Sequence, residues 1–254
     1  MSVPLAHRED GPTDAPVVVL GPSLGTTWEM WDDVAHALSA SYRVVRYDTR
    51  GHGRSPVPAG PYSMAELADD VLAVLDSLGV AEFAMVGLSL GGAIAQQLLL
   101  TSPTRLRAAV LCCTVPSFGG PQPWGERAAT VRSSGMAAIA EATRGRWFTP
   151  RFRAEHPAVV DRLIETMTGL DPEGYAGCCE ALGGFDVTDS LPSIGAPVRV
   201  VAASADAVAP PGAAAAMAEA IPGADLVVVE TSHLATVAGA PFLRPVTEFL
   251  EARL

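Results

Sequence analysis

A serine in the middle of a glycine-rich turn is the residue of this chain best suited to covalent chemistry. Ser89 is the third residue of the segment Gly-Leu-Ser-Leu-Gly-Gly at 87–92, which lies between apolar runs at 83–86 and 93–100. In a strand–turn–helix arrangement the turn strains the serine backbone, so the residues around it must be small. The turn exposes the hydroxyl above the sheet, and the N–H of Leu90 points to where negative charge would develop. Ser89 is therefore the candidate nucleophile.

A nucleophilic serine needs a general base to accept its proton. Two histidines follow Ser89 in the chain: His156 lies beside a proline in a region without strand patterns, whereas His233 follows the β-branched run at 226–229. In an open α/β sheet, functional side chains gather at the carboxyl ends of the strands. We therefore predict His233 as the general base.

The base must in turn be oriented by a carboxylate. Asp206 lies in the loop that follows the apolar run at 198–201, again at the carboxyl end of an expected strand. We predict Asp206 as this acid, which gives the chain order serine, acid, histidine. Two aspartates near the end of a strand-free region and one at the start of a strand are the alternatives: Asp186, Asp189 and Asp225.

Backbone N–H groups are expected to bind the negative oxygen of the tetrahedral intermediate. Leu90 supplies one of them. The other should come from the loop after the run at 17–20, which reads Gly-Pro-Ser-Leu-Gly-Thr at 21–26. Pro22 has no N–H and cannot donate, so we predict Leu24 as the second donor.

Short apolar runs predict the strands that carry these loops. They recur at 17–20, 42–47, 83–86, 109–111, 198–201 and 226–229. Such runs are typical of parallel strands covered on both faces. Helical patterns lie between them, and 63–78 is the clearest because Ser63 and Glu66 can form a capping box. The alternation predicts an α/β fold with a mostly parallel sheet and helices on both faces.

One region breaks the alternation. From about Val115 to Pro197 no strand pattern is seen, and proline, glycine, arginine and tryptophan are frequent. Since ligands bind beyond the carboxyl ends of the strands, an inserted segment at that edge would cover the site. We expect one domain over residues 1–254, with a helical cap inserted at about 117–192.

The charge of the chain is strongly negative but unevenly distributed. A net charge of −11 disfavours nucleic acid or an anionic membrane as a partner. All 17 basic residues are arginines, so no lysine can form a Schiff base. Against two acids, residues 120–153 contain six arginines: Arg127, Arg132, Arg144, Arg146, Arg151 and Arg153. This local excess of positive charge predicts an anionic ligand.

Cysteine spacing and hydropathy exclude further classes. The two adjacent pairs, Cys112-Cys113 and Cys178-Cys179, suit neither a tetrahedral metal site nor a disulfide framework, and we expect buried free thiols. No metal is therefore expected. No apolar run approaches the roughly 18 residues of a membrane span, and no leader-like segment begins the chain. We expect a cytoplasmic protein.

The loop at 48–55 contains another histidine, His52, which could be mistaken for the general base. It precedes Ser89 in the chain, contrary to the order predicted above. We expect Asp48, Arg50 and His52 to hold the loop together by hydrogen bonds.

The chain resembles the α/β-hydrolase superfamily over nearly its whole length, through the segments 87–92 and 50–53 with Asp206 and His233. Within the superfamily it looks like the 3-oxoadipate enol-lactonases of bacterial aromatic catabolism. This narrower likeness includes segments of the insertion, which diverge fastest when substrates change. The segments that carry it are 23–26, 30–32, 46–53, 135–140, 146–150 and 173–179.

The resemblance implies hydrolysis of a small anionic lactone, 3-oxoadipate enol-lactone, to 3-oxoadipate in the beta-ketoadipate pathway, without a cofactor. The arginine-rich insertion fits a substrate carboxylate. We predict substrate contacts from four cap residues, Trp124, Arg127, Arg132 and Trp147. For any one of the arginines the alternative is a solvated surface charge, and for the tryptophans a place in the core.

Other functions could use the same three residues. A carboxylesterase, or a hydrolase that cleaves a carbon–carbon bond, would differ in its pocket and leaving group. A receptor of the same fold would bind a ligand with slow turnover. Measured turnover separates the receptor from the enzymes.

Overall fold

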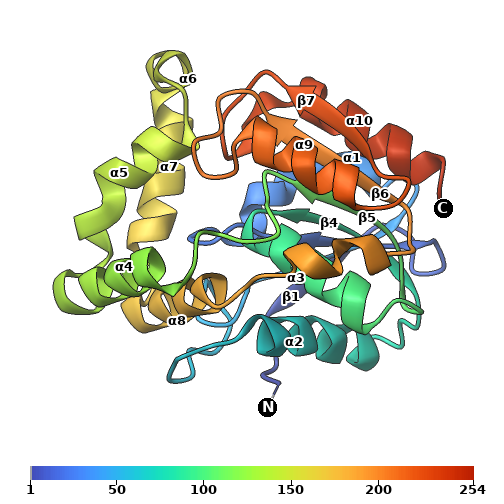
Figure 1. The fold of residues 1–254 in the computed structure, drawn as a ribbon, viewed down its shortest axis with the longest axis horizontal. Coiled ribbons are helices and arrows are strands. Elements are labelled where there is room, and N and C mark those ends of the chain that lie inside the picture. Colours follow the sequence, from blue (N-terminus) through green and yellow to red (C-terminus); the bar gives the residue numbers. More distant parts are fainter. Residues whose placement is uncertain (1) are drawn as a thin grey trace.

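A seven-stranded sheet forms the centre of the computed structural model, which describes residues 2–254 (Figure 1). The strand order is β1-β3-β2-β4-β5-β6-β7. β1 pairs with β3 antiparallel, and the other neighbours in this described sheet pair in parallel. The strands are β1 (His7–Asp10), β2 (Val17–Gly21), β3 (Arg43–Tyr47), β4 (Phe83–Leu88), β5 (Leu106–Cys112), β6 (Val198–Ala203) and β7 (Asp225–Val229).

The inner strands are apolar because layers of helices cover the sheet. Every residue of β4 is buried, as the run at 83–86 predicts. Six strands coincide with the predicted runs, but β1 does not. Its sequence, His-Arg-Glu-Asp, is polar and largely exposed, which suits an edge strand that must not pair with another chain.

Helices pack on both sides of the sheet, with α2 and α3 on one side of it and α10 on the other in Figure 1. The predicted helix at 63–78 is confirmed as α2, and its Ser63–Glu66 capping box is formed. The helices outside the cap, with η3 at the end of the predicted insertion, are η1 (Trp28–Trp31), α1 (Asp32–Leu38), α2 (Met64–Ser77), α3 (Leu90–Thr101), η3 (Thr188–Ser193), α9 (Pro211–Ala220), η4 (Ala235–Ala238) and α10 (Ala240–Glu251).

A group of helices lies between β5 and β6, in the region where we predict the cap, and is called the cap below. Figure 1 shows these green and yellow helices to the left of the sheet. Across the described residues, no named strand interrupts this group, and an isolated bridge between Ser117 and Asp186 flanks it. The cap consists of α4 (Pro121–Ser134), η2 (Met136–Ile139), α5 (Ala140–Trp147), α6 (Pro150–Glu155), α7 (Pro157–Thr168) and α8 (Pro172–Gly183).

The cap is attached to the core most closely through the start of α8. Gly51 and Gly174 approach so tightly that a Cβ on either would overlap the backbone of the other. Beside them, the carboxylate of Glu173 accepts a 3.0 Å hydrogen bond from the N–H of Gly60. The main-chain contact at Gly51 and the Glu173 carboxylate together fix the position of the start of α8 against the core.

The four cysteines are free and buried, which confirms the prediction for them. The described helices include none that is both long and apolar enough to cross a membrane.

Candidate active site

Ser89 occupies the sharp turn between β4 and α3. Its backbone has φ 54° and ψ −110°, a conformation that costs a non-glycine residue energy. The turn closes because its neighbours lack side chains. A Cβ on Gly91 would overlap the carbonyl of Gly21 in β2, and one on Gly87 would overlap the carbonyl of Gly91. The glycines thus permit the strain that presents the serine at the end of the strand.

Two of the predicted residues, Asp206 and His233, meet directly. Asp206 Oδ2 lies 2.8 Å from His233 Nδ1, and the side chains are 0% and 3% exposed. The other carboxylate oxygen accepts the N–H groups of Val208 at 2.7 Å and Ala209 at 2.9 Å. Because Asp206 is held at both oxygens, it fixes the proton on Nδ1 and leaves Nε2 of the imidazole as an acceptor.

The loop that carries His233 is also fixed by the cap. Ser232 Oγ donates a 2.6 Å hydrogen bond to the carbonyl oxygen of Trp147, at the end of α5. The N–H of Leu234 points at the same oxygen, 3.4 Å away. One carbonyl of the cap therefore holds both residues that flank the histidine.

The alternative acids and the alternative base lie elsewhere. Asp225 binds Arg199 at the start of β7, Asp186 forms an isolated bridge with Ser117, and Asp189 is exposed in η3. His156 directly precedes α7, and its ring centroid is 4.7 Å from that of Phe152. None of these side chains lines the cavity at Ser89.

Two amides are free to donate beside the serine. Leu90 is the first residue of α3, where N–H groups have no partner within the helix. Among residues 2–254, the N–H of Leu24 has no hydrogen-bond acceptor. The loop containing Leu24 is joined to α3, since the carbonyl of Pro22 accepts the N–H of Gly91 at 3.0 Å. Both amides thus remain without a partner on segments that are joined to each other, and their role as oxyanion donors stays a prediction.

A cavity of about 40 Å³ brings these groups together with the cap. Three of the four predicted substrate residues line it: Trp124, Arg127 and Trp147. The remaining lining residues come from the loops around Ser89 and from α5 and α8: Ser23, Leu24, Ser89, Thr143, Arg146, Tyr175, Val208 and His233.

Arg127 is a half-buried cation whose hydrogen bonds go to neutral groups. Its Nε donates to Tyr175 Oη at 2.8 Å, and Nη2 donates to Thr143 Oγ1 at 2.9 Å. No carboxylate of residues 2–254 forms an ion pair with it. Since a cation in partly apolar surroundings is costly without a counter-charge, its positive charge is available to a ligand.

Arg132 does not reach the cavity, which corrects the prediction for it. Its guanidinium binds Glu173 at 2.7 Å and Glu180 on the outside of the cap. The hydrogen bond from Arg132 lowers the pKa of Glu173 to about 2. Arg132 therefore links α4 to α8 and is already neutralised.

Arg146 lines the cavity where Arg132 is expected. In the sequence it stands out only as one of six arginines in the basic region. It is exposed, lines the cavity, and forms no ion pair with any residue of the described chain. One feature of the sequence could have identified Arg146 as a cavity residue: it directly precedes Trp147, a predicted substrate contact. With Arg127 it makes the cavity cationic, since the described lining contains no acidic side chain.

The profile of the alpha/beta hydrolase fold family matches residues 16–239. The chain belongs to this family. It is 37% identical to 3-oxoadipate enol-lactonase 2 of Acinetobacter baylyi over 92% of this hydrolase and 88% of the relative. A solved enol-lactonase structure from Burkholderia xenovorans has a TM-score of 0.95 and 38% identity, covering 97% of this chain and 96% of that one. A RutD protein of Variovorax paradoxus, named as a carbamate hydrolase, is 33% identical over 82% of this chain and 80% of its own length.

His52 of this hydrolase is a structural residue of the kind expected. It is buried, its Nε2 accepts the N–H of Gly25 at 3.0 Å, and Nδ1 donates to the carbonyl of Arg50 at 3.3 Å. Burial lowers the pKa of His52 to about 4. The neutral ring thus supports the turn beside Leu24, and protonation of Nε2 would break that support.

We predict that His52 contributes to acid sensitivity. Between pH 6.5 and about 4 the unfolded chain binds a proton at this side chain and the folded chain does not, so stability falls on acidification. His52→Gln keeps an acceptor and a donor but cannot titrate. In urea unfolding across this range, acidification should lower the free energy of unfolding more steeply for the native protein than for His52→Gln. The difference in slope should be up to about 1.4 kcal/mol per pH unit. Parallel curves for the two proteins would contradict the assignment.

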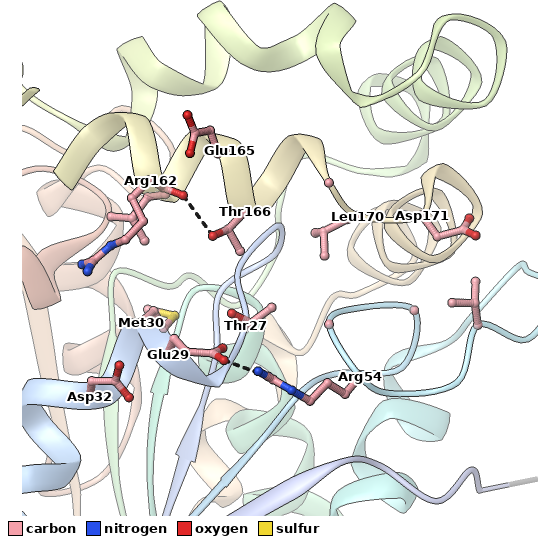
Figure 2. Close-up of a pocket in the computed structure, with 15 residues that line it drawn as sticks. Thr27, Glu29, Met30, Asp32, Arg54, Arg162, Glu165, Thr166, Leu170 and Asp171 are labelled. Carbon is pink, nitrogen blue, oxygen red and sulfur yellow. Dashed lines mark hydrogen bonds and ion pairs between the residues drawn. The ribbon is translucent and has the colours of Figure 1, made fainter. Parts of the chain in front are cut away.

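A larger cleft of about 600 Å³ lies between the cap and the core, away from Ser89 (Figure 2). It is bounded by α7, by η1 and by the loop at 51–57. Figure 2 shows Arg54 directed at Glu29, with which it forms a 2.8 Å hydrogen bond, and Arg162 on the facing helix. Its lining has charges of both signs and no nucleophile paired with a base, so the smaller cavity is the candidate active site.

Proposed function

We propose that this hydrolase opens an enol-lactone that carries a carboxylate, converting 3-oxoadipate enol-lactone to 3-oxoadipate in the beta-ketoadipate pathway of aromatic catabolism. The observation that carries the proposal is the charge of Arg127, which has only neutral partners and lines the cavity that contains Ser89 and His233. The likeness to two enol-lactonases supports the same substrate class.

In the proposed reaction, Ser89 attacks the lactone carbonyl while His233 Nε2 accepts its proton. Asp206 holds the imidazole in the tautomer that makes this transfer possible. The N–H groups of Leu24 and Leu90 bind the oxyanion of the tetrahedral intermediate. Collapse of the intermediate breaks the ring C–O bond, and the electron pair leaves on the enol oxygen.

An enolate is a good leaving group because it rearranges to a ketone. It takes up at carbon, directly or through solvent, the proton that His233 accepted from Ser89, so His233 is neutral again. Ring opening therefore depends less on protonation of the leaving oxygen than amide cleavage does. Water activated by His233 then attacks the acyl-enzyme, which releases Ser89 and a second carboxylate. The product is therefore more negatively charged than the substrate.

The test of the proposal is the rate at which the purified protein consumes 3-oxoadipate enol-lactone, followed by the loss of enol-lactone absorbance. The same preparation should be given a neutral ester and a carbamate of similar size. Fast lactone turnover with weak activity on the others supports the proposal. Fast ester or carbamate turnover without lactone hydrolysis would contradict the proposed substrate and show that the protein is a hydrolase of another substrate class.

Arg127→Met should raise KM for the carboxylated lactone roughly 10- to 100-fold, the loss expected when a hydrogen bond to a charged group is removed. For a neutral ester the change in KM should stay within about threefold, since no carboxylate is lost. Arg162→Met is the matched control, because Arg162 is an exposed cap arginine that lines the other cleft. Equal effects on the two substrates would show that Arg127 acts only through Tyr175 and Thr143.

A further inference from the structure

The hydroxyl of Ser23 is a buried group without a partner. Ser23 is 2% exposed and lines the cavity with Ser89 and His233. Among the described residues, its Oγ has no hydrogen-bond partner. Leaving a hydroxyl unpaired in a protein interior costs stability, so such groups in native structures call for an explanation.

The main chain of Ser23 is held firmly although its side chain is not. Its N–H points at Met30 Sδ, 3.3 Å away, and its carbonyl accepts Thr26 Oγ1 at 2.7 Å. The preceding residue, Pro22, is joined to α3 through the N–H of Gly91. The loop is thus fixed relative to the helix that begins after Ser89, and the buried hydroxyl stays close to its main chain without a partner of its own among the described residues.

The engaged N–H of Ser23 cannot serve as an oxyanion donor, but the hydroxyl can. It lies on the residue directly before Leu24, whose free N–H is the proposed donor of this loop. A donor that is fixed in advance and has no partner in the free enzyme is what stabilises charge that develops only during the reaction.

We propose that Ser23 Oγ donates a third hydrogen bond to the oxyanion formed by attack of Ser89, beside the N–H groups of Leu24 and Leu90. The proton stays on Ser23 throughout, and no bond to Ser23 forms or breaks. The inference rests on the serine mechanism of the proposed function, but it holds for a neutral ester as well as for the lactone.

Ser23→Ala is the direct test, with Thr26→Val as the control for damage to the same loop. For Ser23→Ala we expect kcat to fall roughly 10- to 100-fold on a neutral ester and on the lactone, with KM changed less than threefold. The melting temperature should stay the same or rise, because an unpaired hydroxyl is replaced by a methyl group. A serine with a structural role would lower it.

An arylboronic acid supplies a second readout, because its tetrahedral adduct with Ser89 places a negative oxygen where the oxyanion would lie. Its inhibition constant should rise in Ser23→Ala by about the same factor as kcat falls. Unchanged kcat, or lower kcat with unchanged inhibition, would overturn the proposal. Failure of the lactone assay alone would not, since ester turnover and boronate binding test Ser23 separately.

Discussion

Replacing Ser89 with alanine is expected to lower kcat at least about 10⁴-fold, because the covalent route is lost and only binding and the oxyanion donors remain. The fold should persist. The substitution removes one oxygen and leaves in place the glycines that allow the turn, Gly87 and Gly91. The φ of 54° is as demanding for alanine as for serine, so the change adds no new clash.

The measurement compares lactone and ester turnover by the native protein and Ser89→Ala, with circular dichroism and melting temperature as checks on folding. Ser133→Ala, in which an exposed hydroxyl on α4 is removed, is the control for loss of a serine as such. Residual activity within about tenfold of the native rate would remove Ser89 as nucleophile and with it the proposed mechanism.

Replacing Asp206 with asparagine is expected to lower kcat about 10³- to 10⁴-fold through the imidazole tautomer. An asparagine Oδ1 can still accept the N–H groups of Val208 and Ala209, which keeps the loop in place. Its NH₂ group then faces Nδ1 of His233 as a donor. The proton moves to Nε2, so the imidazole can no longer accept the proton of Ser89.

A pre-steady-state assay with a chromogenic ester separates this effect from a loss of binding. Formation of the acyl-enzyme should slow in Asp206→Asn while KM changes little. Asp186→Asn, which alters an exposed carboxylate that binds Thr188, should behave like the native enzyme. Native-like acylation in Asp206→Asn would mean that another group orients the histidine.

The parts of the fold that depend on backbone constraints were predictable from the sequence. Only small residues allow the turn at Ser89, and the glycines at 87, 91 and 92 therefore mark it in the sequence. The same holds for the order of strands and loops, which brings Asp206 and His233 to one edge of the sheet. The apolar runs do not predict β1, because this exposed edge strand consists of polar residues and has no apolar pattern.

The arginines show where composition stops being informative. Arg127 and Arg132 lie on the same helix, α4. From the basic composition of the region alone, both are equally good candidates to contact the substrate. Five residues correspond to about 140° around a helix, so their side chains point in different directions. Arg127 faces the cavity and Arg132 faces the glutamates of α8. Which face is turned inward depends on the packing of α4 against α8, which the local sequence does not specify.

The carbonyl of Trp147 gives the cap a second role, in the timing of catalysis. The cavity of about 40 Å³ has room for a few water molecules, each needing roughly 10–15 Å³, so we expect the cap to move when a lactone binds beside Ser89. A movement that included the end of α5 would carry Trp147 away from Ser232 and Leu234, the two residues that flank His233. We expect the base to be aligned only while Trp147 holds these two residues, so the conformation that admits substrate and the conformation that hydrolyses it alternate.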